Sequence, residues 1–362
     1  MTWGKNLTEI NSVDINDLHE YFSRPDDRVL KIVSERKDDC IVIYGATGKW
    51  TSDLTEMLLR SLQEIGINKK KVHLVSSFRR MSEFNERFSK YSDLFVVHKV
   101  DLVNAQPSML SSVPDDAQWI IYGVGYKFRT TETDEEYARL CWLYGNTIPY
   151  MVFSHHKYGS DIVVIGSGNG VELTPVDNQA KDDAPLVPKN IYGRSIRDKE
   201  NTIKRILEDN NIEGLSKAVI LRGGYMTDLT YGGLEGPVLA VKNDKEINLS
   251  KLSYFNIIGH RDANIYVILA VNSASNPITT LNLSGHTADI REIVKSAENA
   301  FGKKARIIGE PAELHLLLDG SKIEKLYGQP IDSLEALIQA QIYWIKNGGY
   351  SRALDHHVGE SM

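Results

Sequence analysis

The sequence lacks the features that mark secreted, membrane-spanning and nucleic-acid-binding proteins. Only two of its 362 residues are cysteines, Cys40 and Cys141, which argues against a disulfide framework and favours a reducing compartment. No apolar run reaches the roughly 18 residues that a membrane helix needs, and no basic start with an apolar stretch marks a secretory signal. The net charge of −6 attracts neither nucleic acid nor anionic lipid. We therefore expect a cytoplasmic protein with no nucleic-acid or membrane partner.

A metal site is not expected either. The histidines include two adjacent pairs, at 155–156 and 356–357, and neighbours in sequence rarely face one ion from a helix or a strand. No Cys or Glu partners stand at ligand spacing. We interpret His260, beside Asp262, as a hydrogen-bonded structural residue.

The sequence does contain an alternation of strand and helix patterns from residue 40 onward. Short apolar runs predict strands over 40–44, 72–75, 94–97, 119–122, 161–165, 218–221 and 254–258. Helical patterns are found over 53–65, 81–91, 135–155 and 193–210, and later over 287–301 and 333–347. Strands separated by helices predict an α/β fold, a doubly wound parallel sheet of the Rossmann-like type with a smaller C-terminal lobe. Such a sheet binds its ligands beyond the carboxyl ends of the strands.

The patterns divide the chain into three parts. Residues 1–38 form an N-terminal helical extension, in which a helix over 14–22 is ended by Ser23-Arg-Pro. Residues 39–222 form the dinucleotide-binding domain, to which 254–275 return. Glycine-rich turns loosen the pattern after residue 223, so 223–253 and 276–362 are assigned to the substrate-binding lobe.

The first predicted strand ends in Gly45-Ala-Thr-Gly48, directly before a helix. Glycine permits a tight turn there and lets backbone N–H groups approach a pyrophosphate at the helix N-terminus. Lys49 adds a charge that favours a pyrophosphate. Thr51 stands where such motifs have a third glycine, and we expect a small shift to accommodate it. The stretch therefore predicts dinucleotide binding.

This turn resembles that of the short-chain dehydrogenase/reductase superfamily, in its extended, epimerase/dehydratase-like branch. The resemblance continues in order along almost the whole chain, through Asp101-Leu102, Gly123-Val-Gly-Tyr-Lys127, Gly166-Ser-Gly-Asn169, Asn190-Ile-Tyr192, Arg222-Gly-Gly-Tyr225, Asp262-Ala263, Asn282-Leu-Ser-Gly285 and Tyr327-Gly-Gln-Pro330. The cofactor-binding residues that the resemblance implies are Gly45, Thr47, Gly48, Lys49, Trp50, Ser76, Arg79, Arg80, Asp101, Leu102, Gly123, Val124 and Gly125.

The resemblance also implies the catalytic residues. Tyr192 stands where the family has its catalytic tyrosine, and Ser167 where it has a serine or threonine. Tyr192 would exchange a proton with a substrate oxygen, and Ser167 would stabilise the charge that develops there. Asn146 resembles the helical asparagine that holds a water of the family's proton relay.

One departure from the family pattern affects this chemistry. The family has Tyr-x-x-x-Lys, but Ile196 stands four residues after Tyr192. That lysine holds the nicotinamide ribose and lowers the pKa of the tyrosine, which is about 10 when unperturbed. We expect Lys127 to replace it, with Arg194 and Arg197 as the alternatives.

The choice between the two nicotinamide coenzymes depends on the second strand. NAD-binding members usually carry an acid at its end, and the segment 72–80 has none. Ser76, Arg79 and Arg80 can instead accommodate a 2′-phosphate, so NADP is favoured over NAD.

The leading interpretation is an NAD(P)-dependent oxidoreductase that acts on a hydroxyl or carbonyl of a sugar-like or nucleotide-sugar substrate. We expect Arg222, Tyr225, Asp228 and Tyr231 to line the substrate cleft. Two alternatives stay open: an epimerase or dehydratase with transient hydride transfer, and a non-catalytic dinucleotide-binding sensor. The resemblance further implies a homodimer formed through the helices 135–155 and 193–210.

Overall fold

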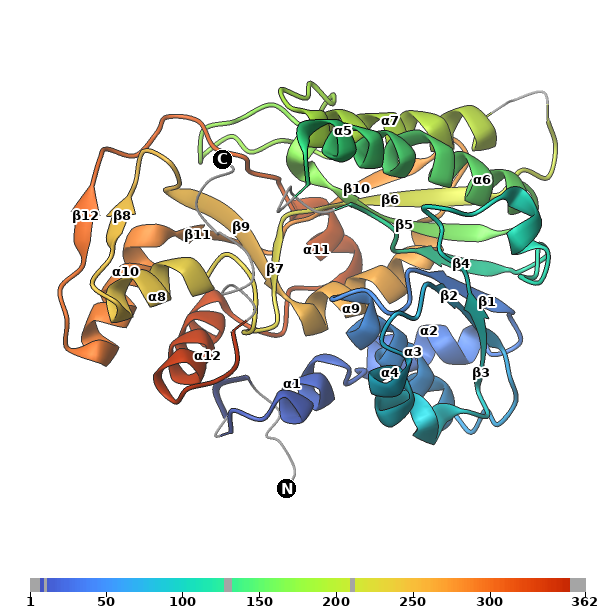
Figure 1. Ribbon diagram of the computed structural model, residues 1–362, viewed down its shortest axis with the longest axis horizontal. Helices are drawn as coiled ribbons and strands as arrows, with labels where there is room; N and C mark the ends of the chain where they lie inside the picture. The colour runs from blue at the N-terminus through green and yellow to red at the C-terminus, as the bar shows by residue number, and fades with distance from the viewer. Residues whose placement is uncertain (1–6, 10–11, 127–131, 209–211, 352–362) are drawn as a thin grey trace.

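A parallel sheet of seven strands forms the centre of the main domain (Figure 1). The computed structural model describes residues 7–9, 12–126, 132–208 and 212–351. In spatial order the strands are β10 (Thr279–Leu283), β6 (Lys217–Gly223), β5 (Asp161–Ser167), β4 (Trp119–Tyr122), β1 (Ile41–Tyr44), β2 (Val72–Ser76) and β3 (Phe95–Lys99). The order β3-β2-β1-β4-β5-β6 is that of a doubly wound dinucleotide-binding sheet. The predicted fold class is confirmed.

Helices cover both faces of this sheet (Figure 1). One face carries α2 (Asp27–Glu35), α3 (Thr51–Glu64), α4 (Met81–Phe88) and α9 (His260–Leu269). The other carries α5 (Asp134–Trp142), α6 (Ile148–His155) and α7 (Ile191–Leu207). Burial from both sides explains why every residue of β1 and β4 is buried and why both strands are strongly apolar.

A second lobe contains a three-stranded sheet with its own core. The sheet is formed by β11 (His286–Asp289), β9 (Tyr254–Gly259) and β7 (Tyr225–Thr227). A separate pair joins β12 (Arg306–Ile308) to β8 (Glu246–Asn248). The helices of this lobe are α8 (Glu235–Lys242), α10 (Ile290–Phe301) and α12 (Leu334–Lys346), which contact one another. Phe255 and Trp344 are buried in the core between them.

The N-terminal extension is packed onto both parts. Its helix α1 (Ile15–Phe22) contacts α3 and α9, and it is capped by Asp14, whose side chain accepts from the N–H of Asn16. Tyr21 and Phe22 are fully buried in the core of the second lobe. The extension therefore braces α3, the helix that follows the glycine turn.

Three predicted elements differ from the structure. The sequence assigned the segment 279–283 to the substrate lobe, but it is the edge strand β10 of the main sheet. Its polar residues Thr279, Thr280 and Asn282 weaken the apolar pattern by which a sheet strand is recognised. The strand predicted over 254–258 is β9 of the second sheet, and the segment that returns to the main domain is the following helix α9 with the 3-10 turn Ala270–Ser273. The helix predicted from residue 287 begins at Ile290, because the preceding residues form β11.

The helix predicted over 135–155 is interrupted. Leu143–Thr147 form a π-helical turn between α5 and α6. Pro149, at the start of α6, has no N–H to donate, which removes one helical hydrogen bond at this point.

No helix within the described ranges is long and apolar enough to cross a membrane. The short helix α11 (Ser321–Tyr327) packs beside β10. Both cysteines are free thiols, with Cys141 buried and Cys40 half-buried. Burial raises the pKa of each thiol, as expected for unreactive cysteines.

Candidate functional site

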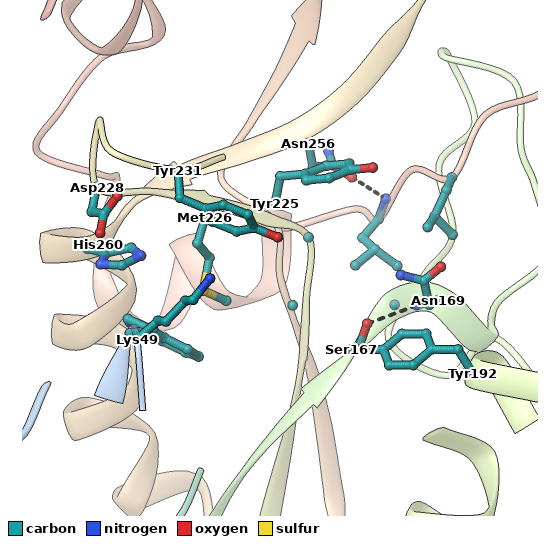
Figure 2. A pocket seen from close by; sticks show the side chains of 16 residues that line it. Lys49, Ser167, Asn169, Tyr192, Tyr225, Met226, Asp228, Tyr231, Asn256 and His260 are labelled. Atoms are coloured by element: carbon teal, nitrogen blue, oxygen red, sulfur yellow. Dashed lines mark hydrogen bonds between the residues drawn. The ribbon is translucent and has the colours of Figure 1, made fainter. Parts of the chain in front are cut away.

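A cavity of about 250 Å³ opens beyond the carboxyl ends of strands from both sheets. Ser167 ends β5 and Gly223 ends β6. Asp228 follows β7 and His260 follows β9. This is the edge at which doubly wound sheets bind their ligands, and the second lobe closes it from the far side (Figures 1 and 2).

The glycine turn after β1 borders this cavity and leaves no room for side chains. Gly45 has a φ of +78°, and a Cβ there would lie 3.0 Å from the carbonyl oxygen of Gly123. A Cβ on Gly48 would lie 2.6 Å from Oγ1 of Thr51.

The turn leads directly into α3, whose N-cap residue Trp50 makes no side-chain capping bond. The N–H groups of Ser52 and Asp53 donate to the carbonyl oxygens of Gly48 and Trp50, at 3.0 and 3.1 Å. A diphosphate would therefore be held by the N–H groups of the turn that precede them, and the residues present fit the diphosphate of a dinucleotide.

Thr51 occupies the place of the missing third glycine and ties the turn together. Its hydroxyl donates to the carbonyl oxygen of Gly45 over 2.5 Å. Its methyl group fills the space that a Cβ on Gly123 would need, at 2.5 Å. Thr51 is therefore accommodated in the turn and adds a hydrogen bond to it.

The other residues implied for the cofactor lie along the ends of β2, β3 and β4. Thr47 and Ser76 share a hydrogen bond of 2.7 Å between their hydroxyls. Arg79 is exposed, with its guanidinium 3.8 Å from the Asp101 carboxylate, and Arg80 pairs with Glu83. Arg79 and Arg80 therefore place two guanidinium groups, each near an acidic side chain, at the surface beyond β2. This is where the sequence predicts a 2′-phosphate.

The loop after β4 approaches the glycine turn from the other side. Val124 is buried, and its side chain would lie 3.5 Å from a Cβ on Gly45. Gly125 is exposed, and no atom of the described residues, apart from its chain neighbours, lies within 4 Å of the Cβ position there. Leu102, after β3, packs against the core of the same face. Lys127 lies outside the described residues.

Ser167 and Tyr192 lie side by side on one wall of the cavity (Figure 2). Ser167 caps the short turn that follows β5, where its Oγ accepts from the N–H of Asn169 at 3.3 Å. Tyr192 is in the first turn of α7, which is capped by Asn190. Burial raises the pKa of Tyr192, and a hydrogen bond with Ser167 only partly opposes that rise. The phenol is therefore protonated at neutral pH.

None of the described cations near Tyr192 takes the place of the family lysine. Ile196 is buried at the position of that lysine. Arg194 is exposed, and Arg197 pairs with Asp198 at 3.2 Å. Lys199 is buried, and its Nζ donates to the carbonyl oxygen of Ile165 at 3.1 Å rather than to a tyrosine. Burial lowers the pKa of Lys199 to about 8.

Two other predicted site residues do not line the cavity. Asn146 lies in the π-helical turn, where its Nδ2 donates to the carbonyl oxygen of Trp142 at 3.3 Å. Arg222 is buried in a double hydrogen bond with Glu200, at 3.0 and 2.9 Å, and also donates to backbone carbonyls of the segment 182–184. Arg222 thus fixes that segment against β6 and has no free donor face directed at a substrate.

The second wall is formed by Lys49 and by residues of the second lobe. The Lys49 ammonium lies 5.0 Å from the centre of the Tyr231 ring. Asp228 is buried, and its Oδ1 accepts from the hydroxyl of Thr230 at 2.8 Å. Burial raises the pKa of Tyr225 to about 12 and also raises that of Tyr231. Tyr225 and Tyr231 therefore line the cavity as neutral phenols. Asp228 lines it beside them.

Among the cavity residues that the sequence reasoning did not assign to the site, four have side chains that contain nitrogen, oxygen or sulfur. They are Asn169, Met226, Asn256 and His260. His260 was interpreted as structural beside Asp262, but the carboxylate that it bonds is Asp53, at 3.0 Å. The signal that was available is position, because His260 directly follows the carboxyl end of a strand.

The comparisons with known proteins agree with this fold. The sequence matches no model of a protein family and no curated protein. A UDP-glucuronic acid 4-epimerase from Bacillus cereus, solved with NAD, is similar in structure with a TM-score of 0.65 and 18% identity over 85% of this chain and 99% of that chain. The Bordetella bronchiseptica enzyme WbmG, in complex with NAD and UDP, has a TM-score of 0.63 and 17% identity over 86% of this chain and 96% of that chain.

A third similar structure extends the range of chemistry. A dTDP-glucose 4,6-dehydratase from Bacillus anthracis, in complex with NAD, has a TM-score of 0.66 and 12% identity, over 87% of this chain and 99% of that chain. At these identities the likeness concerns the fold. The predicted resemblance is confirmed at the level of the fold, which this chain shares with this epimerase, this dehydratase and a short-chain dehydrogenase/reductase superfamily protein from Agrobacterium tumefaciens.

Proposed function

We propose that the protein is an NAD(P)-dependent enzyme that oxidises or reduces a hydroxyl or carbonyl carbon of a sugar-like or nucleotide-sugar substrate. The observation that carries this proposal is the pair of hydroxyls of Ser167 and Tyr192 on a cavity that borders the glycine turn. A substrate oxygen between them can accept two hydrogen bonds, which stabilise charge that develops on it. The similar structures solved with UDP-linked sugars or with UDP support the substrate class.

The glycine turn and its neighbours would hold the coenzyme. Gly45, Gly48 and Gly123 let the turn pack closely at the start of α3, where a diphosphate would bind, and Lys49 adds a positive charge. The nicotinamide, when bound, supplies or accepts a hydride. Arg79 and Arg80 favour NADP through a 2′-phosphate, whereas the similar structures contain NAD.

Tyr192 serves as a proton donor in this proposal. Its raised pKa keeps the phenol neutral, so it donates to a substrate carbonyl oxygen as negative charge grows there. Ser167 donates a second hydrogen bond to the same oxygen. Reduction is the direction that a neutral phenol assists. For oxidation Tyr192 needs a nearby positive charge, for which Lys127 remains our candidate.

A second candidate function is a dinucleotide-binding sensor without turnover. It is favoured by one observation, the buried apolar Ile196 in place of the lysine that activates the tyrosine. An epimerase, in which the hydride returns to the substrate, is the second enzymatic alternative and is supported by the similar epimerase structures.

We also propose that the protein forms a homodimer through α5, α6 and α7. Trp142 and Tyr150 are 61% and 63% exposed on α5 and α6, which is unusual for large apolar side chains. A partner copy would bury them by helix-on-helix packing.

The test uses the purified full chain with NAD or NADP and a panel of UDP-glucose, UDP-glucuronic acid and dTDP-glucose. Product formation is followed by mass spectrometry and the redox state of the coenzyme by absorbance. Tyr192→Phe should lower turnover by about 10²–10⁴-fold, while Tyr158→Phe, an exposed tyrosine away from the cavity, should not. Unchanged turnover in Tyr192→Phe would show that the catalytic assignment is wrong. Tight coenzyme binding without turnover of any sugar would favour the sensor.

A further inference from the structure

The N-terminal extension is linked by hydrogen bonds to the residue at which the glycine turn becomes α3. That residue is Trp50, the N-cap of α3, which also lines the cavity. Its indole Nε1 donates to Oδ1 of Asn264, on α9, at 2.7 Å. Asn264 is fully buried, and its Nδ2 donates to the carbonyl oxygen of Phe22 at 3.0 Å. Two bonds in series therefore join the last residue of α1, through α9, to the start of α3.

A carboxamide suits this place because it must donate on one side and accept on the other. Phe22 is the last residue of α1, so its carbonyl has no partner within the helix and needs a donor. The indole of Trp50, which is half-buried, has a single polar group, an N–H, and needs an acceptor. Asn264 supplies both from one planar group. An apolar side chain of the same size would leave both groups without this partner.

A second contact joins the same two segments. His19, three residues before Phe22 in α1, has its Nδ1 2.9 Å from Oδ1 of Asp53. Asp53 lies in the first turn of α3, three residues after Trp50. Residues three apart lie on one face of a helix, so one face of α1 holds the start of α3 at two points. The direct contacts of α1 with both α3 and α9 agree with this arrangement (Figure 1).

The start of α3 is also the place where the diphosphate of a coenzyme would bind. Trp50 belongs to the turn and to the helix at once, because its carbonyl oxygen accepts from the N–H of Asp53 at 3.1 Å. A bond that fixes the Trp50 side chain therefore also restrains the backbone that follows Gly48. A site that is already held in its binding geometry loses less conformational freedom when the ligand binds.

We propose that Asn264 is a positioning residue of the coenzyme site and that the N-terminal extension is a working part of that site. Both act through Trp50 and the start of α3. This inference rests on the proposed function, because that function supplies the coenzyme. It adds α1 and α9 to the elements that determine coenzyme affinity. It also implies a reciprocal coupling, in which loss of the α1 contact weakens coenzyme binding and bound coenzyme tightens the docking of α1.

Calorimetric titration of the full chain with NAD and NADP compares the wild type with two variants on α9. Asn264→Leu should weaken coenzyme binding by about tenfold, which corresponds to about 1.4 kcal/mol and is the size expected for one hydrogen bond. Tyr266→Phe is the matched control. Tyr266 is also fully buried and donates to a distant backbone carbonyl, that of Gly328, at 2.6 Å, but it does not line the cavity.

The control variant should bind the coenzyme as the wild type does. Equal affinity in Asn264→Leu and in Tyr266→Phe would overturn this inference and leave the proposed function intact. A wild type that binds neither coenzyme would contradict the proposed function, and this inference with it.

A second readout measures the coupling from the other side and works in the wild type alone. Hydrogen exchange of the backbone amides of α1, followed by mass spectrometry, should become about tenfold slower when coenzyme is bound, because the coupling is reciprocal. The slowing should persist in Tyr266→Phe and disappear in Asn264→Leu. If Asn264 were only structural, its loss would speed exchange but keep the effect of the coenzyme. Wild-type exchange that bound coenzyme does not change would overturn the proposal, even where Asn264→Leu does not fold.

Discussion

Replacement of Asp53 by asparagine should remove a large part of the stability of the protein. The Asp53 carboxylate is fully buried and receives hydrogen bonds from Arg87 at 2.7 Å, His19 at 2.9 Å and His260 at 3.0 Å. The asparagine side chain keeps the size but loses the charge, which leaves the Arg87 guanidinium less well compensated. Removal of one partner of a buried ion pair typically costs about 3–5 kcal/mol. We expect Asp53→Asn to lose that much of the free energy of unfolding.

The pH dependence gives this prediction its sign. The pKa of Asp53 is lowered by folding from an ordinary value of 3.8. Its contribution to stability is therefore fully present above pH ~4 and is lost as the pH falls through the lower pKa of the folded state. The difference in stability between the wild type and Asp53→Asn should shrink as the pH is lowered below about 4.

Urea unfolding at several pH values, followed by circular dichroism, measures both effects. Asp27→Asn is the control, because Asp27 also lies in the first turn of a helix but is exposed. It should change stability by less than about 0.5 kcal/mol. A loss in Asp53→Asn as small as that of the control, or a loss that does not vary between pH 7 and pH 3, would refute the reasoning.

Three further predictions concern the site and the assembly. Ile196→Lys places a cation one helical turn from Tyr192, which should lower the pKa of the phenol by about 1–3 units. The oxidation rate at pH 7 should then rise by roughly tenfold or more. A pH–rate profile identical to that of the wild type would contradict this. Arg79→Ala should weaken binding of NADP by about tenfold and leave that of NAD unchanged, measured by calorimetry, whereas equal effects on both coenzymes would rule out a 2′-phosphate contact. Trp142→Glu should convert a dimer to a monomer in light scattering, while Tyr158→Glu should not, and a wild-type protein that is already a monomer would contradict the proposed assembly.

The sequence predicts the main sheet well because its strands are buried on both faces. The strands β1 and β4 consist of uninterrupted apolar or aromatic residues, and this pattern identifies them without knowledge of the fold. The edge strand β10 could not be assigned in the same way, because three of its five residues are polar and one side of it has no neighbouring strand among the described residues.

The candidate site could be predicted where it depends on local sequence. The glycine turn, Ser167 and Tyr192 each lie at a junction between a strand or loop and a helix, which the pattern of residues locates. Roles that depend on distant partners could not be predicted. Arg222 was expected at the substrate, but Glu200, on the neighbouring helix α7, holds it in a buried ion pair. His260 was expected to be structural, and its link to Asp53 exists only in the folded chain.

Calorimetric titration with NAD and NADP tests the central claim, which is that a dinucleotide binds against the glycine turn at the start of α3. Two variants give the titration a matched control. Gly45 and Gly66 have nearly the same φ, +78° and +79°, so alanine imposes similar backbone strain at each. Only the Cβ at Gly45 meets another part of the protein, at 3.0 Å from Gly123, whereas nothing lies within 4 Å of the one at Gly66. The wild type and Gly66→Ala should bind at least one of the two coenzymes, and Gly45→Ala should bind neither. A wild type that gives no heat of binding with either coenzyme would contradict the account.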